Sequence, residues 1–281
     1  MQTAIASTNW HARLALRLEN RGSRTVIASR QHHGPLVIQK PFYPEGNPCH
    51  IYLLHPPGGL VGGDQLSLEI NVDPTAHTLI TTPGASRFYR SAGPCAAQTQ
   101  QLNVAQHGIL EWMPQETILF DQCNASVQTQ VNLQPDSRFI GWEILCLGRK
   151  ASGEKFDNGL LRQKFQISYD KKPLLIERAR LEGGSALLSA PWGLANHTTV
   201  GTMVIASGDK HLLKQIREMM EPLSQTTPDE LFSATLINNL LVCRYLGPQA
   251  QSAKNLFLRV WRIARPHLLT INACEPRIWN T

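Results

Sequence analysis

The run HPPGGLVGGDQLSLEINV (residues 55–72) decides how this sequence folds, because a glycine-rich loop leads directly into a strand pattern. Its second part, residues 66–72, alternates apolar and polar side chains, which is typical of a strand with one buried face. Its first part, residues 55–64, holds two glycine pairs, and glycine permits positive φ and close backbone approach. We therefore expect an unusual loop path followed by a half-buried strand.

Three roles are open to this loop: a cradle for an anion, a turn that places Asp64, or a simple corner. The loop lacks the Lys-Ser/Thr ending of a P-loop, and a strand follows it rather than the N-terminus of a helix. A nucleotide site is therefore disfavoured. A tight turn that displays His55 and Asp64 is favoured.

Strand patterns continue from this loop up to about Ala206. Residues 127–133 repeat the alternation, and turn signals with proline, glycine or aspartate separate the runs. The further strand-like runs are residues 78–81, 109–113, 141–147, 161–169, 174–181 and 199–206. Because no helical periods lie between them, a parallel βαβ fold is excluded and a large β assembly is favoured.

After Gly208 the apolar spacing becomes helical. A first helix is expected over residues 212–220, ended by Pro222, and the sequence TPDE (residues 227–230) resembles a capping box with proline at the first helical position. The second and third helices are expected over residues 231–245 and 253–264. One domain, residues 1–281, is therefore predicted, with a β body over about 10–207 and a helical part over about 209–265.

Composition and charge limit the class of protein. Of the 281 residues 42% are hydrophobic and 17% charged, which indicates a globular chain. The net charge of +6 is spread along the sequence, whereas nucleic-acid binding needs a concentrated stripe of cations. Nucleic acid is therefore disfavoured as a partner, and an acidic protein partner stays open.

Cysteine and apolar spacing argue against several further classes. The six cysteines are widely spaced without a C-x-x-C pair, which disfavours a structural zinc site and a disulfide scaffold. No H-x-x-x-H or G-x-S-x-G motif is present, and no apolar segment approaches the length of a membrane span. A cytoplasmic protein without a membrane anchor is the expectation.

Three glutamates lie on apolar faces of predicted strands. Glu143, Glu177 and Glu111 each share strand parity with apolar neighbours, whereas Glu69 lies on an ordinary polar face. A carboxylate in an apolar environment is unfavourable unless it is paired, protonated or bound to a metal. Arginine partners could satisfy all three, so a polar interior path and simple ion pairs are both open.

Several longer motifs occur in one order along the chain. They are HPPGGLVGGD (55–64), RFYR (87–90), LEWMPQETILFD (110–121), GWE (141–143), LGR (147–149), GEKF (153–156) and GLLR (159–162). With these motifs the sequence resembles the UreD (UreH) family of urease accessory proteins over about residues 10–205. The predicted C-terminal helices are compatible with that family.

The resemblance implies a mainly β fold: a long, twisted β-helix-like body with two or three α-helices near the C-terminus. It also implies a non-enzymatic scaffold and metallochaperone that conveys nickel to the active site of apo-urease. The implied partners are UreF, UreG through UreF, and the urease structural subunits, with a dimer of heterodimers formed with UreF. Transient Ni²⁺ and no tightly bound cofactor are expected.

The resemblance also gives the unusual carboxylates a role on a nickel path. Asp64, Glu143 and Glu177 are placed on it, with Glu111 and Asp121 as further candidates. Carboxylate ligands hold a metal less tightly than thiolates or several imidazoles, which favours release. The structural motif of the family is assigned to His55, Gly58, Gly59, Gly62, Gly63 and Arg90.

Two other interpretations stay open at this stage. A β-rich hydrolase or carbohydrate-active enzyme could use Glu111 and Glu143 as paired carboxylates, which must then lie about 5–10 Å apart across a cleft. A pure docking scaffold would pair its glutamates with arginines, and nickel would never enter it.

Overall fold

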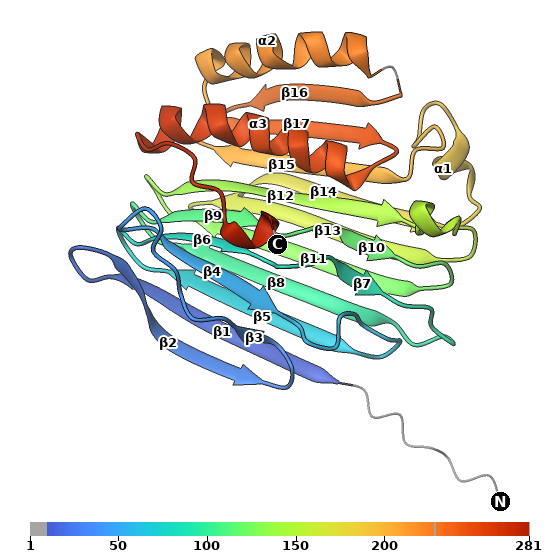
Figure 1. Cartoon of the computed structure of the whole chain (residues 1–281), viewed down its shortest axis with the longest axis horizontal. Helices are drawn as coiled ribbons and strands as arrows, with labels where there is room; N and C mark the ends of the chain where they lie inside the picture. The colour runs from blue at the N-terminus through green and yellow to red at the C-terminus, as the bar shows by residue number, and fades with distance from the viewer. Residues whose placement is uncertain (1–9, 228, 281) are drawn as a thin grey trace, which may run out of the picture.

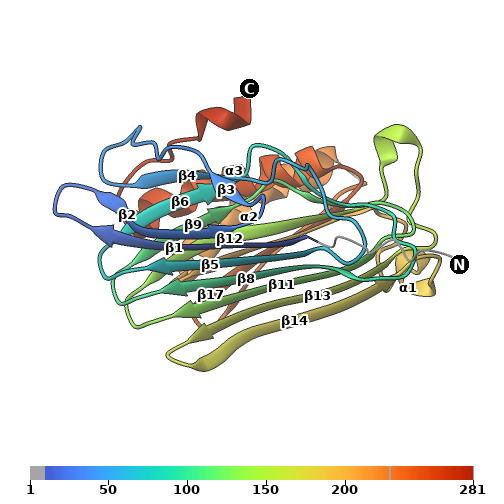
Figure 2. The same ribbon diagram turned by 90° about the horizontal axis from the view of Figure 1, so that it is seen from below.

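The computed structural model describes residues 10–227 and 229–280, and within them the fold is built from two stacked β-sheets and a helical layer (Figure 1). One sheet has seven strands, in the order β14 (Lys172–Glu182), β13 (Leu160–Tyr169), β11 (Asn124–Leu133), β8 (Ala96–Val104), β5 (Gln65–Val72), β1 (His11–Asn20) and β2 (Thr25–His33). Figure 2 shows these strands side by side, with β14 at one edge.

The second sheet has ten strands. Its main order is β16 (Leu231–Ile237), β17 (Leu240–Gly247), β15 (Thr199–Ala206), β12 (Arg138–Leu147), β9 (Ile109–Met113), β6 (His77–Thr81), β4 (Cys49–Leu54) and β3 (Val37–Ile38). The short strand β10 (Thr117–Leu119) pairs with β12 and with β7 (Ser86–Phe88).

The chain winds between the two sheets as stacked coils. Strands β5, β8, β11 and β13 pair in parallel in one sheet, and β4, β6, β9 and β12 do so in the other. Three successive corners are alike, because Thr75, His107 and Asp136 each adopt a φ close to +60°. The mainly β, β-helix-like body expected from the resemblance is confirmed.

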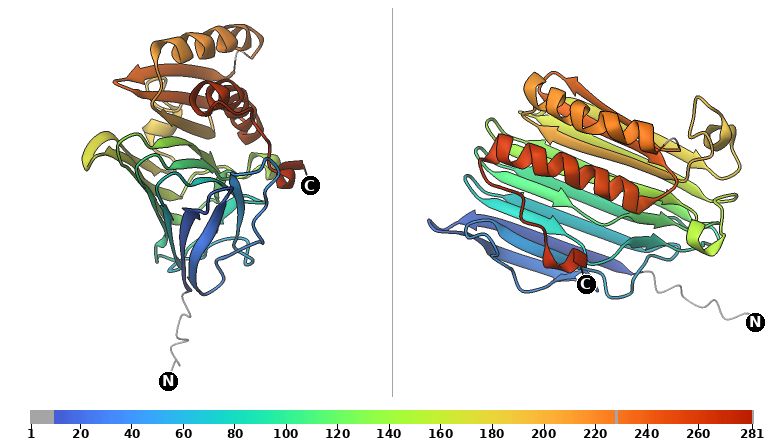
Figure 3. Two further views of the ribbon diagram at one scale, coloured as in Figure 1. Left: turned by 90° about the vertical axis from the view of Figure 1, so that its left-hand side faces the viewer. Right: turned by 45° about the horizontal axis from the view of Figure 1, so that its top comes forward.

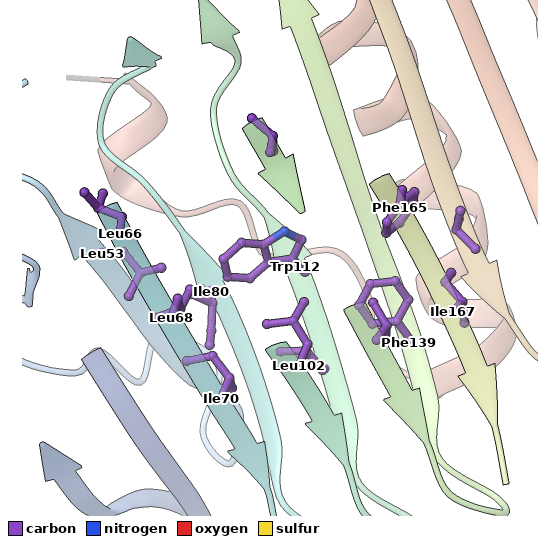
Figure 4. Close-up of a cluster of buried hydrophobic side chains, with 14 of the residues drawn as sticks. Leu53, Leu66, Leu68, Ile70, Ile80, Leu102, Trp112, Phe139, Phe165 and Ile167 are labelled. Carbon is purple, nitrogen blue, oxygen red and sulfur yellow. The ribbon is translucent and has the colours of Figure 1, made fainter. Parts of the chain in front are cut away.

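Two hydrophobic cores result from this arrangement. The larger core fills the space between the sheets, where Trp112, Phe139 and Phe165 lie among leucine and isoleucine side chains (Figure 4). The smaller core lies between the ten-stranded sheet and the helices, and includes Trp142 and Trp261. Alternate residues of β9 and β12 therefore serve different cores, so strand parity decides which side a residue faces.

Three α-helices occur in the described residues: α1 (Ala186–Ser189), α2 (Lys210–Thr226) and α3 (Ala250–Leu269), with 3-10 turns at Lys150–Ser152 and Arg277–Asn280. Helices α2 and α3 cover the outer face of the ten-stranded sheet (Figure 3). Pro222 and Pro266 lie inside these helices instead of ending them. None of the described helices has the length and apolar character needed to cross a bilayer.

The helix expected over residues 231–245 is wrong, because β16 and β17 form an antiparallel hairpin there. The chain turns at Asn238, whose φ is +56°. The run 240–243 is buried on both faces between β16 and β15, and a short apolar run of this kind does not distinguish a helix from an inner strand. Residues 1–9, 228 and 281 lie outside the described part, including Pro228 of the expected capping box.

Candidate functional site

A cavity of about 260 Å³ lies between the two sheets and reaches the loop that carries the glycine pairs. Its walls come from β4, β9 and β12 on one side and from β5, β8 and β11 on the other. Leu68 and Trp112 contribute apolar surface, whereas Gln100, Glu143 and His55 contribute polar groups. The cavity is thus a space between the sheets with a mixed lining, and it reaches the surface at exposed residues such as Pro83 and Arg87.

Glu143 is the carboxylate on the wall of this cavity, and it is 8% exposed. Both of its oxygens accept hydrogen bonds from the facing sheet, one from Thr129 Oγ1 and one from Gln163 Nε2 at 2.8 Å. No described cation lies within ion-pair distance of it. Burial raises the pKa of Glu143, and the negative charge of Glu177 raises it further, against the two hydrogen bonds.

Glu177 lies close to Glu143, on the inner side of β14. Its side chain is 19% exposed and forms an ion pair with Arg244 of β17, whose side chain is 50% exposed. This contact crosses from one sheet to the other at the side where β14 is the edge strand. Among the five carboxylates predicted for the nickel path, Glu143 and Glu177 are the two that the fold brings together.

Strand register extends this pair into a polar row across the sandwich. In the ten-stranded sheet the row contains Glu143, Thr202 and Arg244 on neighbouring strands. In the seven-stranded sheet the facing row contains Gln100, Thr129, Phe165 and Glu177. The row therefore leads from the cavity wall towards the side between β14 and β17, with Phe165 as its apolar member. We call this the open side, because the Arg244 side chain there is exposed to solvent.

Glu111 lies on the opposite face of the ten-stranded sheet, in the helix-side core. It is fully buried and accepts hydrogen bonds from Trp261 Nε1 at 2.6 Å and from Arg265, while His77 Nε2 lies 2.8 Å away. Burial acts to raise its pKa, but the bond to His77 and the charge of Arg265 lower it. Glu111 and Glu143 therefore do not face each other across a cleft, and the paired-carboxylate arrangement of the hydrolase interpretation is not formed.

Asp64 is held by the backbone of its own loop. It is 5% exposed, and its two oxygens accept the N–H groups of Trp10 at 3.0 Å and Val61 at 2.9 Å. The carboxylate thus closes the turn and fixes the start of β1. The sequence places Asp64 at an inward turn correctly, but its oxygens are already used.

Asp121 binds backbone groups in a similar way. Its Oδ1 accepts the N–H groups of Asp157 at 2.9 Å and Asn158 at 2.7 Å. Desolvation acts to raise its pKa, but the bonds from Asn158 outweigh it and lower the pKa. Asp121 therefore connects two loops at the surface, and it is not among the residues that line the cavity.

The glycine loop packs tightly on the segment around β7. A Cβ at Gly59 would lie 2.5 Å from the Tyr89 ring, and Leu60 N donates to the Arg87 carbonyl at 2.7 Å. Gly58 and Gly63 adopt positive φ, while Gly62 lies against Ser91. Arg90 is exposed just after β7.

His55 connects the loop with the cavity. It lines the cavity, and its buried Nε2 has no hydrogen-bond partner among the residues that the structure describes. Burial lowers the pKa of His55, and the nearby carboxylate of Asp64 opposes this effect. The imidazole is therefore available to a ligand in the cavity.

Sequence reasoning missed several polar residues of this site. Thr129 and Gln163 each occupy an inward position between apolar neighbours of the same face, whereas Gln100 lies between Gln98 and Leu102 on the inner face of β8. The parity rule that isolates Glu143 also identifies Thr129 and Gln163, but not Gln100, because Gln98 makes its face partly polar. Arg244 escapes this rule because the sequence pattern predicts a helix over residues 231–245, where the structure has β17. Trp112 adds to the cavity wall a buried Nε1 that has no hydrogen-bond partner in the described part of the chain.

The site does not contain a ready-made metal centre. In residues 10–227 and 229–280, no three His, Cys, Asp or Glu side chains are grouped so that they could hold a metal ion. Glu143 and Glu177 offer oxygen ligands for a passing ion, and His55 offers a nitrogen. Such sparse ligands suit weak and exchangeable coordination.

Comparisons with known proteins give a consistent result. A family model described as UreD urease accessory protein matches residues 11–280. The urease accessory protein UreD of Alcanivorax borkumensis is 45% identical over 276 residues, which cover 97% of this chain and 92% of that protein. The UreD of Klebsiella aerogenes is 42% identical over 274 residues, which cover 97% of both chains. The UreD of Pseudomonas putida (strain W619) is 42% identical over 272 residues, which cover 97% of this chain and 95% of that protein. The similarity includes the β16–β17 hairpin and helices α2 and α3.

Proposed function

The chain belongs to the UreD family of urease accessory proteins, and from this premise we propose that it is a non-enzymatic scaffold that conveys nickel to the urease active site. A role in urease maturation follows from the family. The nickel path and the partners below belong to the proposal. We assign the interior cavity as the space through which the ion passes.

The observation that carries this proposal is the state of Glu143. It lies on the cavity wall without a described cation partner, and it has a second carboxylate, Glu177, beside it. A divalent cation between two carboxylates removes their mutual repulsion, and oxygen ligands release the ion more readily than thiolates do. The pair is therefore suited to brief binding followed by transfer.

The proposed path uses part of the predicted residue set. Nickel enters the cavity near His55, contacts Glu143 and reaches Glu177 at the open side between β14 and β17. Asp64, Glu111 and Asp121 are assigned to structural roles instead, because they lie outside the cavity lining and the row of Glu143 and Glu177: backbone N–H groups hold Asp64 and Asp121, and Arg265 holds Glu111 in the helix-side core.

The proposed partners are UreF, UreG through UreF, and the urease structural subunits, in the cytoplasm. A dimer of heterodimers with UreF is the proposed assembly. Neither nucleic acid nor a membrane has a part in it, and Ni²⁺ is the cargo instead of a resident cofactor.

The proposal is tested by co-expressing Glu143→Gln with the urease subunits, UreF and UreG. The matched control is Glu69→Gln, which removes the same charge from the outer face of β5, where Glu69 pairs with exposed Arg13. We expect Glu143→Gln to lower the nickel content and activity of the recovered urease several-fold while the chain still co-purifies with UreF and urease. The control is expected to match the wild type.

Two results contradict the proposal in different ways. Full nickel incorporation with Glu143→Gln removes this residue from the path and favours the pure docking scaffold. In that interpretation glutamates pair with arginines, as Glu177 does with Arg244. Failure of the wild-type chain to associate with UreF or urease removes the scaffold role itself.

A further inference from the structure

The outer face of strands β13 and β14 carries cations directly opposite each other. Register places Arg162 across from Arg180 and Lys164 across from Arg178. Three of these side chains are exposed and Lys164 is half-buried, and together they border a shallow hollow with Ser126 and Gln128 of β11. We define these four residues as the basic patch, and Figure 2 shows β13 and β14 at the edge of the seven-stranded sheet.

Pairing like charges directly across two strands is unfavourable for the sheet. Protection of an exposed edge explains cations on β14, because edge strands are often charged to prevent pairing with another sheet. It does not explain Arg162 and Lys164, which lie on the inner neighbour β13. The unfavourable pairing on both strands therefore calls for another explanation.

Neutralisation within the chain is incomplete. Arg180 pairs with Glu182 at 3.0 Å, and Arg162 donates to the amide oxygen of Asn124 at 3.1 Å. Lys164 and Arg178 have no ion pair with a described carboxylate. The basic patch thus keeps a net positive charge. It concentrates cations on one surface, whereas the net charge of +6 is spread along the sequence.

We propose that the basic patch is the docking surface for an acidic surface of a partner protein, and that this partner is the one that receives the metal. Four cations on a flat sheet face match a broad acidic surface better than a small anion, which needs an enclosing pocket. Base-stacking aromatic side chains, which single-stranded nucleic acid requires, do not line the hollow.

The position of the patch identifies its role. Glu177 points inward from β14, between the outward-facing Arg178 and its neighbour Ile176. A protein docked on the patch therefore lies against the outer face of the edge strand whose inner face carries Glu177, beside the end of the proposed nickel path, and this part rests on the proposed function. Until docking, the cations repel Ni²⁺ from the outside and so limit loss of the ion to solvent.

The test is a double charge reversal, Lys164→Glu with Arg178→Glu, in the full chain co-expressed with UreF and the urease structural subunits. The matched control is Arg30→Glu with Lys40→Glu, two exposed cations near the opposite edge of the molecule. We expect the recovery of urease with the tagged chain to fall at least about tenfold for the reversal at low salt. The neutral pair Lys164→Gln with Arg178→Gln is expected to show a smaller loss, and the control none.

UreF co-purification and soluble yield report whether each variant folds. Urease recovery that is equal for the wild type, the reversal and the control overturns the docking surface and leaves the proposed function intact. If the wild type recovers no urease, the proposed function fails together with this choice of partner. Loss of binding to a DNA duplex by the reversal, with unchanged urease recovery, overturns the inference in favour of a nucleic-acid surface.

Discussion

Arg265 of α3 and Glu111 of β9 form an ion pair in which both side chains are fully buried, with Arg265 Nε 3.0 Å from Glu111 Oε2. The same guanidinium binds Glu45 at 2.6 Å and the carbonyl oxygen of Asn272. One side chain thus connects the last long helix, the middle of the ten-stranded sheet, the loop before β4 and the C-terminal segment. This network holds the helical layer on the sheet.

Replacement of Arg265 by methionine is expected to destabilise the protein strongly. Removing the guanidinium leaves the buried Glu111 carboxylate without its arginine partner, and breaking a buried ion pair in this way costs about 3–5 kcal/mol. The measurement is the free energy of unfolding from urea titration of the purified chain. Arg262→Met is the control, because its pair with Glu275 is partly exposed and a pair of that kind is worth about 0–1 kcal/mol. Equal losses of unfolding free energy for Arg265→Met and Arg262→Met contradict the assignment of Arg265 as the residue that holds the helical layer on the sheet.

Glu45 is expected to make stability depend on pH in the acid range. Burial acts to raise its pKa, but hydrogen bonds from His50 and Arg265 lower it from 4.5 to about 2. Because the folded-state pKa is depressed, the stabilisation is present above the unfolded value of 4.5 and is lost as the pH falls towards 2. The difference in unfolding free energy between the wild type and Glu45→Gln should therefore shrink over this window. A difference that is constant with pH argues against the ionised form as its source.

The strands of the β body can be predicted from the sequence, because the alternation of apolar and polar residues shows which side chains are buried. Ile109–Met113 and Thr199–Ala206 have the bounds that the pattern gives, and Glu143 faces the inner core as its parity requires. Parity also places Glu111 on the same face of β9 as Met113. It does not reveal that this face packs against α3 instead of the seven-stranded sheet. That assignment depends on which layer covers which face, and a period of two residues carries no such information.

The hairpin β16–β17 was missed for a related reason. Leu231, Thr235 and Leu241 happen to follow helical spacing, and the apolar run at 240–243 fits either a helix or an inner strand. The polar pair Asn238-Asn239 between two apolar runs is the signal that favours a hairpin. Contacts such as Glu177 with Arg244 join segments far apart in sequence, and local patterns cannot predict them.

The glycine loop gives a third prediction. Gly59→Ala places a methyl group 2.5 Å from the Tyr89 ring and 2.9 Å from the Arg87 carbonyl oxygen, so the loop must move away from β7. Overpacking of this kind costs about 1–3 kcal/mol. Urea unfolding should show this loss for Gly59→Ala and none for Gly84→Ala, where a Cβ meets open space. A neutral Gly59→Ala means that close approach is not the reason for the glycine.

The last prediction concerns the cation that holds Glu177. Arg244 neutralises this carboxylate, so Arg244→Gln leaves Glu143 and Glu177 as two neighbouring acids with no cation between them. Their repulsion is relieved when a divalent ion binds, and we expect Ni²⁺ affinity to rise about tenfold, equivalent to about 1.4 kcal/mol. Equilibrium dialysis of Ni²⁺ against the purified UreF complex measures this change.

Matched variants separate this effect from a general loss of positive charge. Arg13→Gln removes a cation paired with Glu69 on the outer face and should leave Ni²⁺ affinity unchanged. Adding Glu143→Gln to Arg244→Gln should abolish the gain, because the two acids then no longer act as a pair. If Arg244→Gln binds Ni²⁺ as the wild type does, Glu177 does not contact the ion and the path must end at Glu143.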